Sequence, residues 1–327
     1  MDIGKISESV LKRSVLKQIK RRRNEVLVGP GVGEDCSVIK LNEDEVFVIS
    51  TDPITGTVKD IGKLAVHITA NDISSNGAEI IGIMLSILLP QGTKESELKS
   101  MMQEIEMVCS SLNIEVLGGH TEVTEAVNQP IITVTGVGKM PKEYMIKTKG
   151  IKPEQEIVMT KWAGLEGTAI IASKKEEELK AKYTSEFISG AIHFIDHISV
   201  VKEAMIGRRM GVTSMHDVTE GGIFGALWEL GEASHVGMEV DLKKIPLRQE
   251  TVEICEFYNL NPYQLISSGV MLMVTDKANA LVEELKKNNI PAAVIGRIQK
   301  GNDRVVINED EKRFLAPPKS DELYKVK

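Results

Sequence analysis

The chain has 327 residues, and its 40 lysines and arginines against 47 aspartates and glutamates leave a formal net charge of −7. This length predicts about two domains, each large enough to bury a hydrophobic core. The acidic balance and an aromatic content of only 4% argue against nucleic acid as a ligand, because phosphate binding needs clustered cations and base stacking needs aromatic platforms.

Three cysteines, Cys36, Cys109 and Cys255, are scattered without a paired spacing, and no secretory leader precedes them. This pattern predicts reduced thiols and therefore a cytoplasmic protein. The longest apolar run, residues 80–89, is about half the length needed to cross a bilayer. We therefore expect no membrane segment.

The first half of the chain alternates helical and strand-like patterns. Residues 6–23 carry apolar side chains at a helical period and end in a cationic run, which either complements the dipole of a helix end or contacts an anion. A glycine-rich stretch follows at 29–35. Strands are predicted at 36–40, 46–50, 80–89, around 116 and at 131–137, and helices at 61–76 and 94–112.

A charged turn at 149–153 separates two patterned halves, which places a domain boundary there. We therefore expect an N-terminal domain, residues 1–150, and a C-terminal domain, residues 151–327. Alternating strands and helices in both halves indicate an α/β or α+β layered fold. In the second half, strands are predicted at 156–160, 270–275 and 292–298, and helices over 176–210, 222–234, 249–258 and 277–288.

Acidic residues recur beside glycines where strands are expected to end. Such carboxylates suit Mg²⁺ bound with substrate phosphates, and glycines allow the backbone to approach those phosphates. Taken singly, each acid is equally typical of a helix cap or an Asx-turn, and each glycine cluster of a plain turn. The acids are Glu34 and Asp35 after Gly33, Asp52 at a strand end, Asp72 after Asn71, Glu122 after the 118–121 turn, and Asp217 and Glu220 before Gly221.

The order of these motifs resembles the AIR synthase-like superfamily of ATP-using enzymes, and most closely its hydrogenase-maturation HypE-like members. The resemblance covers nearly the whole chain. The matching segments are Gly33-Glu34-Asp35 with Cys36 to Ile39, Ser50-Thr51-Asp52, Asp60 to Val66 with Lys63, Asn71-Asp72-Ile73 with Gly77-Ala78, Gly118-Gly119-His120-Thr121, and His216 to Gly222.

The resemblance implies two α/β domains and a homodimer in which N-terminal strands complete a shared barrel. It also implies ATP and Mg²⁺ bound by the N-terminal domain. By position in the motifs, metal ligation falls to Asp35, Asp52 and Asp72, and catalysis to Asp72, Asp217 and His120. The remaining nucleotide contacts fall to Gly33, Glu34, Lys63, Asn71, Gly118, Gly119 and Thr121.

Three departures limit the transfer of function. HypE-like proteins act on a cysteine at the end of their own tail, whereas the last cysteine here is Cys255. His120 stands where relatives usually carry an acid, and imidazole suits softer metals than Mg²⁺, so it either contacts substrate or changes the metal count. No cysteine precedes residue 33, which argues against a selenophosphate synthetase.

Two further features are open. The turn from Lys161 to Thr168 either holds an anionic group at a helix start or is a plain strand-to-helix turn. His193 and His197 have the i, i+4 spacing of zinc ligands, but no third or fourth ligand is recognisable in the sequence.

The function expected from the sequence is an ATP- and Mg²⁺-dependent enzyme that phosphorylates a carbonyl or amide oxygen of a small-molecule or protein-borne substrate. One alternative is a non-catalytic nucleotide-binding scaffold in a maturation pathway. Another is an activity like that of thiamine-monophosphate kinase or AIR synthase. The sequence names neither the substrate nor the partner.

Overall fold

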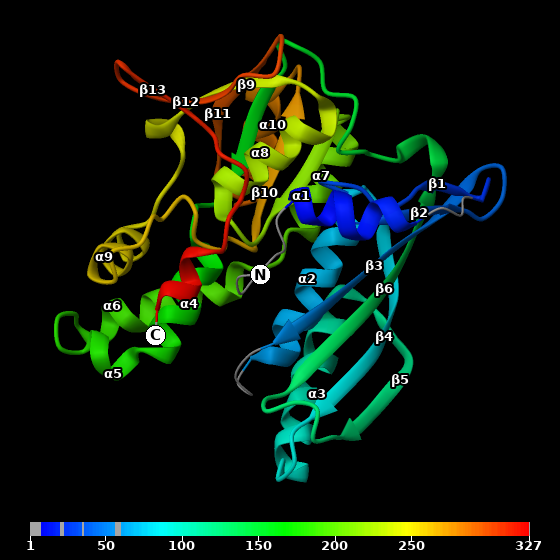
Figure 1. Cartoon of the computed structure of the whole chain (residues 1–327), viewed down its shortest axis with the longest axis vertical. Helices are drawn as coiled ribbons and strands as arrows, with labels where there is room; N and C mark the ends of the chain where they lie inside the picture. Colours follow the sequence, from blue (N-terminus) through cyan, green and yellow to red (C-terminus); the bar gives the residue numbers. More distant parts are fainter. Residues whose placement is uncertain (1–7, 20–22, 35, 56–59, 327) are drawn as a thin grey trace. The chain divides into compact units, whose positions relative to one another are not determined.

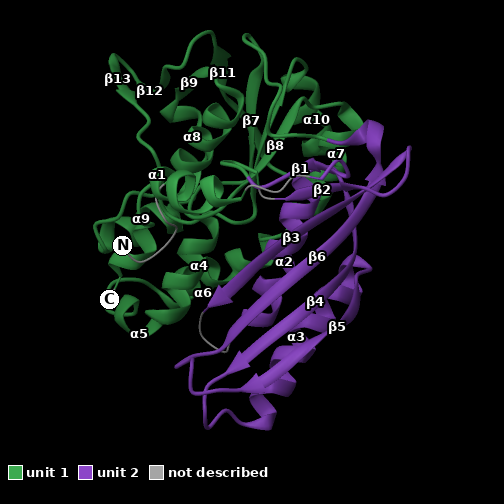
Figure 2. Cartoon of the chain, turned by 45° about the vertical axis from the view of Figure 1, so that its right-hand side comes forward, with its two compact units in different colours: residues 1–21, 31–34, 146–327 green, residues 22–30, 35–145 purple. Residues whose placement is uncertain are grey.

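The computed structural model describes residues 8–19, 23–34, 36–55 and 60–326. The chain forms two compact units (Figure 2): unit 1 comprises residues 1–21, 31–34 and 146–327, and unit 2 comprises residues 22–30 and 35–145. The chain passes from unit 2 to unit 1 for the last time at residue 146, near the turn at 149–153 where the sequence predicts a domain boundary. The N-terminal helical turns and the 31–34 segment nevertheless belong to unit 1, so no single cut in the sequence separates the two units.

Unit 2 is built on a six-stranded sheet in the order β1–β2–β3–β6–β4–β5 (Figure 1). All neighbouring pairs are antiparallel except β4 with β5. The strands are β1 (Val26–Val28), β2 (Ser37–Lys40), β3 (Glu45–Thr55), β4 (Glu79–Leu89), β5 (Glu115–Val123) and β6 (Ile131–Pro141), and a short turn of helix, η3 (Lys142–Tyr144), follows them.

Two helices, α2 (Ile61–Ser75) and α3 (Glu95–Leu112), cover one face of this sheet (Figure 2). Burial along β3 and β6 alternates, since Val46, Val48, Ile132 and Val134 point under the helices and are fully buried. On the opposite face no helix of the described part of unit 2 covers the strands, and Met84 is 50% exposed.

Unit 1 contains a seven-stranded sheet in the order β13–β12–β9–β11–β7–β10–β8, in which only β12 and β9 pair in parallel. Both units are therefore mixed α/β structures, as the sequence predicts, although their sheets are largely antiparallel. The strands are β7 (Glu156–Thr160), β8 (Ser214–Val218), β9 (Gly237–Asp241), β10 (Val270–Thr275), β11 (Ala292–Gln299), β12 (Arg304–Asn308) and β13 (Glu311–Phe314).

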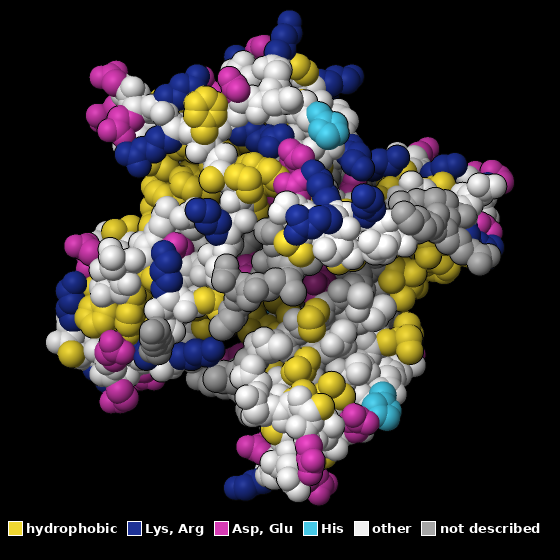
Figure 3. All heavy atoms as spheres, in the orientation of Figure 1, with side chains coloured by type: hydrophobic (Ala, Val, Ile, Leu, Met, Phe, Trp, Pro, Cys, Tyr) yellow, Lys and Arg dark blue, Asp and Glu magenta, His cyan; other side chains and the backbone are white. Residues whose placement is uncertain are grey.

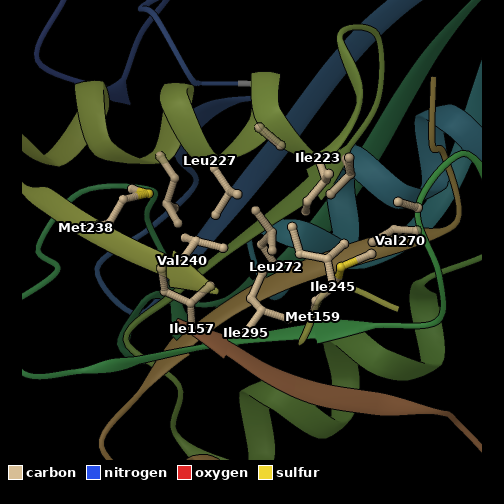
Figure 4. Close-up of a cluster of buried hydrophobic side chains, with 14 of the residues drawn as sticks. Ile157, Met159, Ile223, Leu227, Met238, Val240, Ile245, Val270, Leu272 and Ile295 are labelled. Carbon is tan, nitrogen blue, oxygen red and sulfur yellow. The ribbon is translucent and has the colours of Figure 1, made fainter. Parts of the chain in front are cut away.

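The central strands of this sheet are covered on both faces. Alternate residues of β7 and β10 pack beneath α8 (Gly222–Ser234), where Leu227 and Leu272 lie in one large cluster (Figure 4). The intervening residues, among them Val158 and Met273, pack against α7 (Val201–Met210) and α10 (Ala278–Lys287). Burial on both sides explains why these strands are continuously apolar rather than alternating.

A third apolar cluster in unit 1 joins helices away from the sheet, and the C-terminal turn η6 packs on it through Leu323. The elements of this cluster are α4 (Leu165–Lys174), α5 (Glu176–Leu179), α6 (Ser185–Ile192), α9 (Gln249–Phe257) and η6 (Glu322–Lys325). The short turns η4 (His193–His197) and η5 (Leu242–Lys244) pack instead on the cluster beneath α8, through Phe194 and Leu242.

Two predicted helices are broken into pieces. The stretch 176–210 contains α5, α6, η4 and α7, because Thr184 caps a new helix by accepting from the Phe187 N–H at 3.3 Å. Of the N-terminal helix predicted over 6–23, residues 8–18 form α1 (Glu8–Val10), η1 (Leu11–Val15) and η2 (Leu16–Gln18), and residues 6, 7 and 20–22 lie outside the described part of the chain. No helix among the described residues combines the length and apolarity of a bilayer crossing.

On the face shown in Figure 3, acidic and basic side chains are interspersed, and hydrophobic side chains gather beneath the β12–β13 hairpin. A cavity of about 380 Å³ lies there within unit 1. The stacked rings of Phe224 and Tyr263, 5.2 Å apart, and the chain at Leu315 and Ala316 form part of its lining.

Candidate functional site

Two of the acids identified from the sequence lie side by side in unit 2. Ser50 Oγ donates to Asp72 Oδ2 at 2.6 Å and lies 3.2 Å from Asp52 Oδ2. Ser50 and Asp72 are buried, and Asp52 is half-buried. Because a hydroxyl carries one proton, it cannot donate to both carboxylates at once. A cation held by the two carboxylates would offset their mutual repulsion.

The close approach of α2 to the sheet places Asp72 against Ser50. Gly136 pairs with Ser50 across β3 and β6, and a Cβ at position 136 would lie only 2.5 Å from Thr69 Cγ2 of α2. A side chain there would push the helix away from the strand. Asn71, next to Asp72, is fully buried. Gly136 therefore allows α2 to lie close enough to β3 for Asp72 to reach Ser50.

The start of α2 is fixed by a carboxylate from α3. Glu104 accepts from the Gly62 N–H at 3.0 Å and the Asp60 N–H at 3.4 Å, satisfying amides that the first helical turn leaves without partners. Burial raises the pKa of Glu104, and these two N–H donors oppose that rise. Lys63 forms an ion pair with Asp60 at 3.0 Å. Since Lys63 precedes Asp72 by nine residues, about 13 Å along the helix axis, it does not join the carboxylate pair.

The glycine-rich segment 118–121 lies inside β5, not in a turn, which corrects the expectation from the sequence. Gly119 pairs with Leu85 of β4, and a Cβ at Gly119 would lie 1.9 Å from the Leu85 carbonyl oxygen. This glycine is therefore required by strand pairing, whether or not a phosphate approaches it. Gly118 and Thr121 are exposed on the same edge strand.

His120 does not lie with Asp52 and Asp72 in the described chain. Paired residues share a face of a sheet: Asp52, Val134, Leu85 and Gly119 form one row on the face beneath the helices. His120 belongs to the adjacent row with Ser86, on the open face, about 14 Å of strand spacing from β3. Its ring Nε2 is 3.1 Å from Glu122 Oε2.

The other acidic motifs belong to unit 1. Asp217 lies within β8 and is 2% exposed, whereas the sequence suggested a turn. A Cβ at Gly33 would lie 3.2 Å from Ala233 Cβ of α8, and Glu34, buried beside it, pairs with Lys149 at 3.1 Å. Asp35 lies outside the described residues. The glycine-rich stretch at 29–35 thus contributes two of its predicted site residues to unit 1 rather than to unit 2.

The strand-to-helix turn after β7 has a structural role. Lys161 Nζ donates to the carbonyls of His197, Ser199 and Gly269 and pairs with Glu203 at 2.6 Å. With its donors consumed inside the protein, this lysine is not available to an anion. Burial lowers the pKa of Lys161.

His193 and His197, which have the sequence spacing of zinc ligands, make other contacts in the structure. His193 Nδ1 lies 2.7 Å from the Ser189 carbonyl oxygen, and His197 packs edge-on against Trp162. Within the described ranges no three His, Cys, Asp or Glu side chains converge in a way that could hold a metal. The three cysteines are buried, and burial raises the pKa of Cys255 to about 12, so its thiol is a core group and not a nucleophile.

Residues absent from the set predicted by sequence also carry polar chemistry. Ser50 joins Asp52 to Asp72, and its place in the Ser50-Thr51-Asp52 motif was a usable signal. In unit 1, Glu166 and Asp321 are buried carboxyls, and burial raises the pKa of Glu166 to about 7 and that of Asp321 to about 6. Asp321 stands in the C-terminal tail, where no pattern marks it.

The donor chemistry of the carboxylate pair fits Mg²⁺. This ion takes one or two carboxylates and completes its shell with waters and substrate phosphate oxygens. Asp52 and Asp72 supply that number of carboxylates, and the hydroxyl between them is a further oxygen donor. Ser50, Asp52 and Asp72, the described residues of this site, are all oxygen donors, and none is a soft ligand that would favour a different metal.

Two family models match the chain and together cover most of it. The N-terminal domain of AIR synthase related proteins matches residues 33–140, and the C-terminal domain of the same proteins matches residues 152–308. The first match contains the Asp52–Asp72 pair, and the second contains Asp217. The last nineteen residues lie beyond both.

Curated relatives align over much of the chain. A protein of Methanocaldococcus jannaschii, whose name places it in hydrogenase expression and formation, is 26% identical over 93% of this chain and 91% of its own length. The carbamoyl dehydratase HypE of Cupriavidus necator is 28% identical over 76% of this chain and 70% of its own.

A solved structure of the hydrogenase maturation protein HypE in complex with ATP superimposes with a TM-score of 0.73 at 20% identity. The match covers 98% of this chain and 97% of that one. At this identity the comparison shows a shared fold.

Proposed function

The chain belongs to the AIR synthase related family, and from this premise we propose that it is an ATP- and Mg²⁺-dependent enzyme that phosphorylates a carbonyl or amide oxygen. The observation that carries the proposal is the pair of carboxylates, Asp52 and Asp72, held around Ser50. Such a pair matches what Mg²⁺ bound to nucleotide phosphates requires.

The residues of unit 2 have separate tasks in this proposal. Asp52 and Asp72 hold Mg²⁺, joined by Asp35 as the motif order implies, and Ser50 orients the Asp72 carboxylate. When bound, the ion neutralises charge on the phosphates. Phosphoryl transfer needs positioning and charge neutralisation rather than a protein nucleophile, so a site made of acids and a hydroxyl suffices. Asp217, in unit 1, is proposed to contact the substrate.

The names of relatives support this assignment and bear on which molecule supplies the acceptor oxygen. One relative is called a carbamoyl dehydratase, and a HypE structure of the same fold was solved with ATP. This chain has no cysteine after Cys255, which is buried in the α4–α6–α9 cluster. We therefore propose that the acceptor oxygen belongs to a small-molecule or protein-borne substrate and that Cys255 does not carry it.

Calorimetry with ATP and Mg²⁺ tests the proposal. The wild-type protein should bind ATP in a Mg²⁺-dependent manner, and Asp72→Asn should weaken binding by a factor of about 100 or more, as loss of a charged ligand predicts. Asp44→Asn, an exposed acid of the same unit, is the matched control and should behave as wild type. Absence of binding by folded wild-type protein would refute the proposal.

We also propose that the protein is a homodimer formed through the open face of the unit 2 sheet. The edge strand β5 pairs only with β4 among the described strands. Met84 of β4 and Leu117 of β5 are half-exposed. A second copy would cover this apolar surface. Sedimentation should show a dimer for the wild type and a monomer for Met84→Glu. A wild-type monomer at micromolar concentration would contradict the proposal.

A further inference from the structure

The C-terminal tail, beyond the family matches, packs into unit 1. Leu323 and Val326 pack against the α4–α6–α9 cluster. Pro318 contacts the start of α8, since a Cβ at Gly221 would lie 3.3 Å from Pro318 Cβ. Glu322 Oε2 accepts from the Asn261 N–H at 3.0 Å. The tail is therefore anchored by both apolar and polar contacts.

Asp321 is the centre of this anchorage. Its carboxylate is 2% exposed and accepts three backbone N–H groups from three segments. Oδ2 accepts from Gly221 at 2.7 Å, and Oδ1 accepts from Ile266 at 3.2 Å and from Leu323 at 2.8 Å. Three such bonds to one carboxylate fix its position and those of its donors.

Segment 263–268 links Asp321 to both glycine-rich loops of unit 1. The Ile266 carbonyl accepts from Gly167 at 2.9 Å, and Ser267 Oγ accepts from Gly164 at 2.7 Å, which fixes the turn into α4. The Thr219 carbonyl accepts from Ser267 at 3.4 Å, which fixes the loop after β8.

The tail also meets the acids of these loops. Burial raises the pKa of Tyr324, and the nearby carboxylates of Glu220 and Asp321 add to that rise. Glu166, at the start of α4, is close enough to Asp321 for their charges to interact. The tail therefore contacts the loop that directly follows β8, the strand that carries the candidate substrate residue Asp217.

We propose that Asp321 is a positioning residue: from the C-terminal tail it holds the loop 219–221, between β8 and α8, against segment 263–268 in one geometry. Residues 318–326 then belong to the framework that holds this loop. The proposal rests on the proposed function insofar as Asp217, on the strand that leads into loop 219–221, takes part in the reaction. Asp321 itself touches no reacting atom.

The test uses the full chain with Asp321→Gly, Asp321→Asn and, as a matched control, the exposed Asp310→Asn. Asp321→Gly should lower the kcat of Mg²⁺-dependent ATP hydrolysis about tenfold or more, since a misplaced loop impairs turnover. The Kd for ATP should stay within about twofold, because the nucleotide residues lie in unit 2. Formate, which replaces the missing carboxylate, should restore part of the kcat.

Asp321→Asn should show an intermediate loss, because its amide oxygen can accept from Ile266 and Leu323 while its NH₂ group faces the Gly221 N–H. Amide hydrogen exchange at residues 221–224 should quicken in Asp321→Gly and slow again with formate. An unchanged kcat and unchanged exchange, or losses that formate does not reverse, would overturn the inference. If wild-type protein does not bind ATP, the proposed function fails, and the exchange result alone decides the role of Asp321.

Discussion

The two sheets of this protein differ in whether helices cover both of their faces or only one. In unit 1, β7 and β10 lie between helices on both sides, so successive residues such as Val158 and Met159 are fully buried in different clusters. In unit 2, helices cover one face only, and residues on the other face such as Met84 are half-exposed. A sheet that is covered twice completes its own core, whereas a sheet covered once has a surface for a partner.

The positions of the candidate functional side chains also differ between the two units. The candidate metal-binding carboxylates of unit 2 lie where α2 meets the covered face, and His120 lies on the open face. In unit 1 the buried carboxyls Glu166 and Asp321 lie among loops that meet near the helix starts. The difference between the two sheets therefore suggests separate experiments for each unit.

The largest expected effect is a core truncation in the doubly covered sheet. Leu272→Ala should lower the free energy of unfolding by about 4 kcal/mol, because Leu272 is fully buried and its removal leaves a cavity. Chemical denaturation measures this, and the loss should not depend on protein concentration.

Met84→Ala, on the open face of unit 2, is the comparison for Leu272→Ala. It should cost less than about 0.5 kcal/mol in dilute protein, as exposed substitutions do. If a second copy covers this face, the cost should rise with protein concentration. A large loss that is independent of concentration would show that the face is covered within the chain.

A smaller effect concerns the buried carboxyl Glu166. Its folded pKa of about 7 lies above the value of 4.5 expected when unfolded, so its ionisation destabilises the fold increasingly as pH rises from about 4.5 to about 7. Glu166→Gln should therefore stabilise the protein by about 2 to 3 kcal/mol above pH 7 and by little below pH 4.5.

Thermal unfolding across pH 4 to 8 would measure the Glu166→Gln difference. The exposed Glu283→Gln on α10 is the control and should not show the rise with pH. A constant difference between Glu166→Gln and wild type at every pH would contradict the prediction.

The remaining predictions concern nucleotide affinity and compare the two faces of the unit 2 sheet. Ser50→Ala should weaken Mg²⁺-dependent ATP binding about tenfold, because it removes the donor between two carboxylates. His120→Ala should change the affinity by less than about twofold if the site lies within one chain, since its distance from β3 exceeds a Debye length of about 10 Å. A larger His120 effect would indicate that a second copy brings this residue to the nucleotide.

Local sequence determined much of the architecture and the family. The strands and helices follow hydrophobic periodicity and glycine punctuation, which depend on near neighbours, so β4, α3 and α8 occur close to their predicted ranges. The order of acid and glycine motifs sufficed for membership of the AIR synthase related family. Periodicity also placed Asp72 on a helix, whereas it ended the strand at Ser50, before Asp52, which lies inside β3.

Tertiary structure decided what those residues meet. Ser50 reaches Asp72 only because α2 lies close over Gly136, and the open-face position of His120 follows from the pairing of β4 with β5. Two of the three donors to Asp321, Ile266 and Gly221, lie 55 and 100 residues away along the chain. Such contacts depend on how distant segments pack, and no local pattern encodes them, which is why the sequence alone did not reveal the role of the tail.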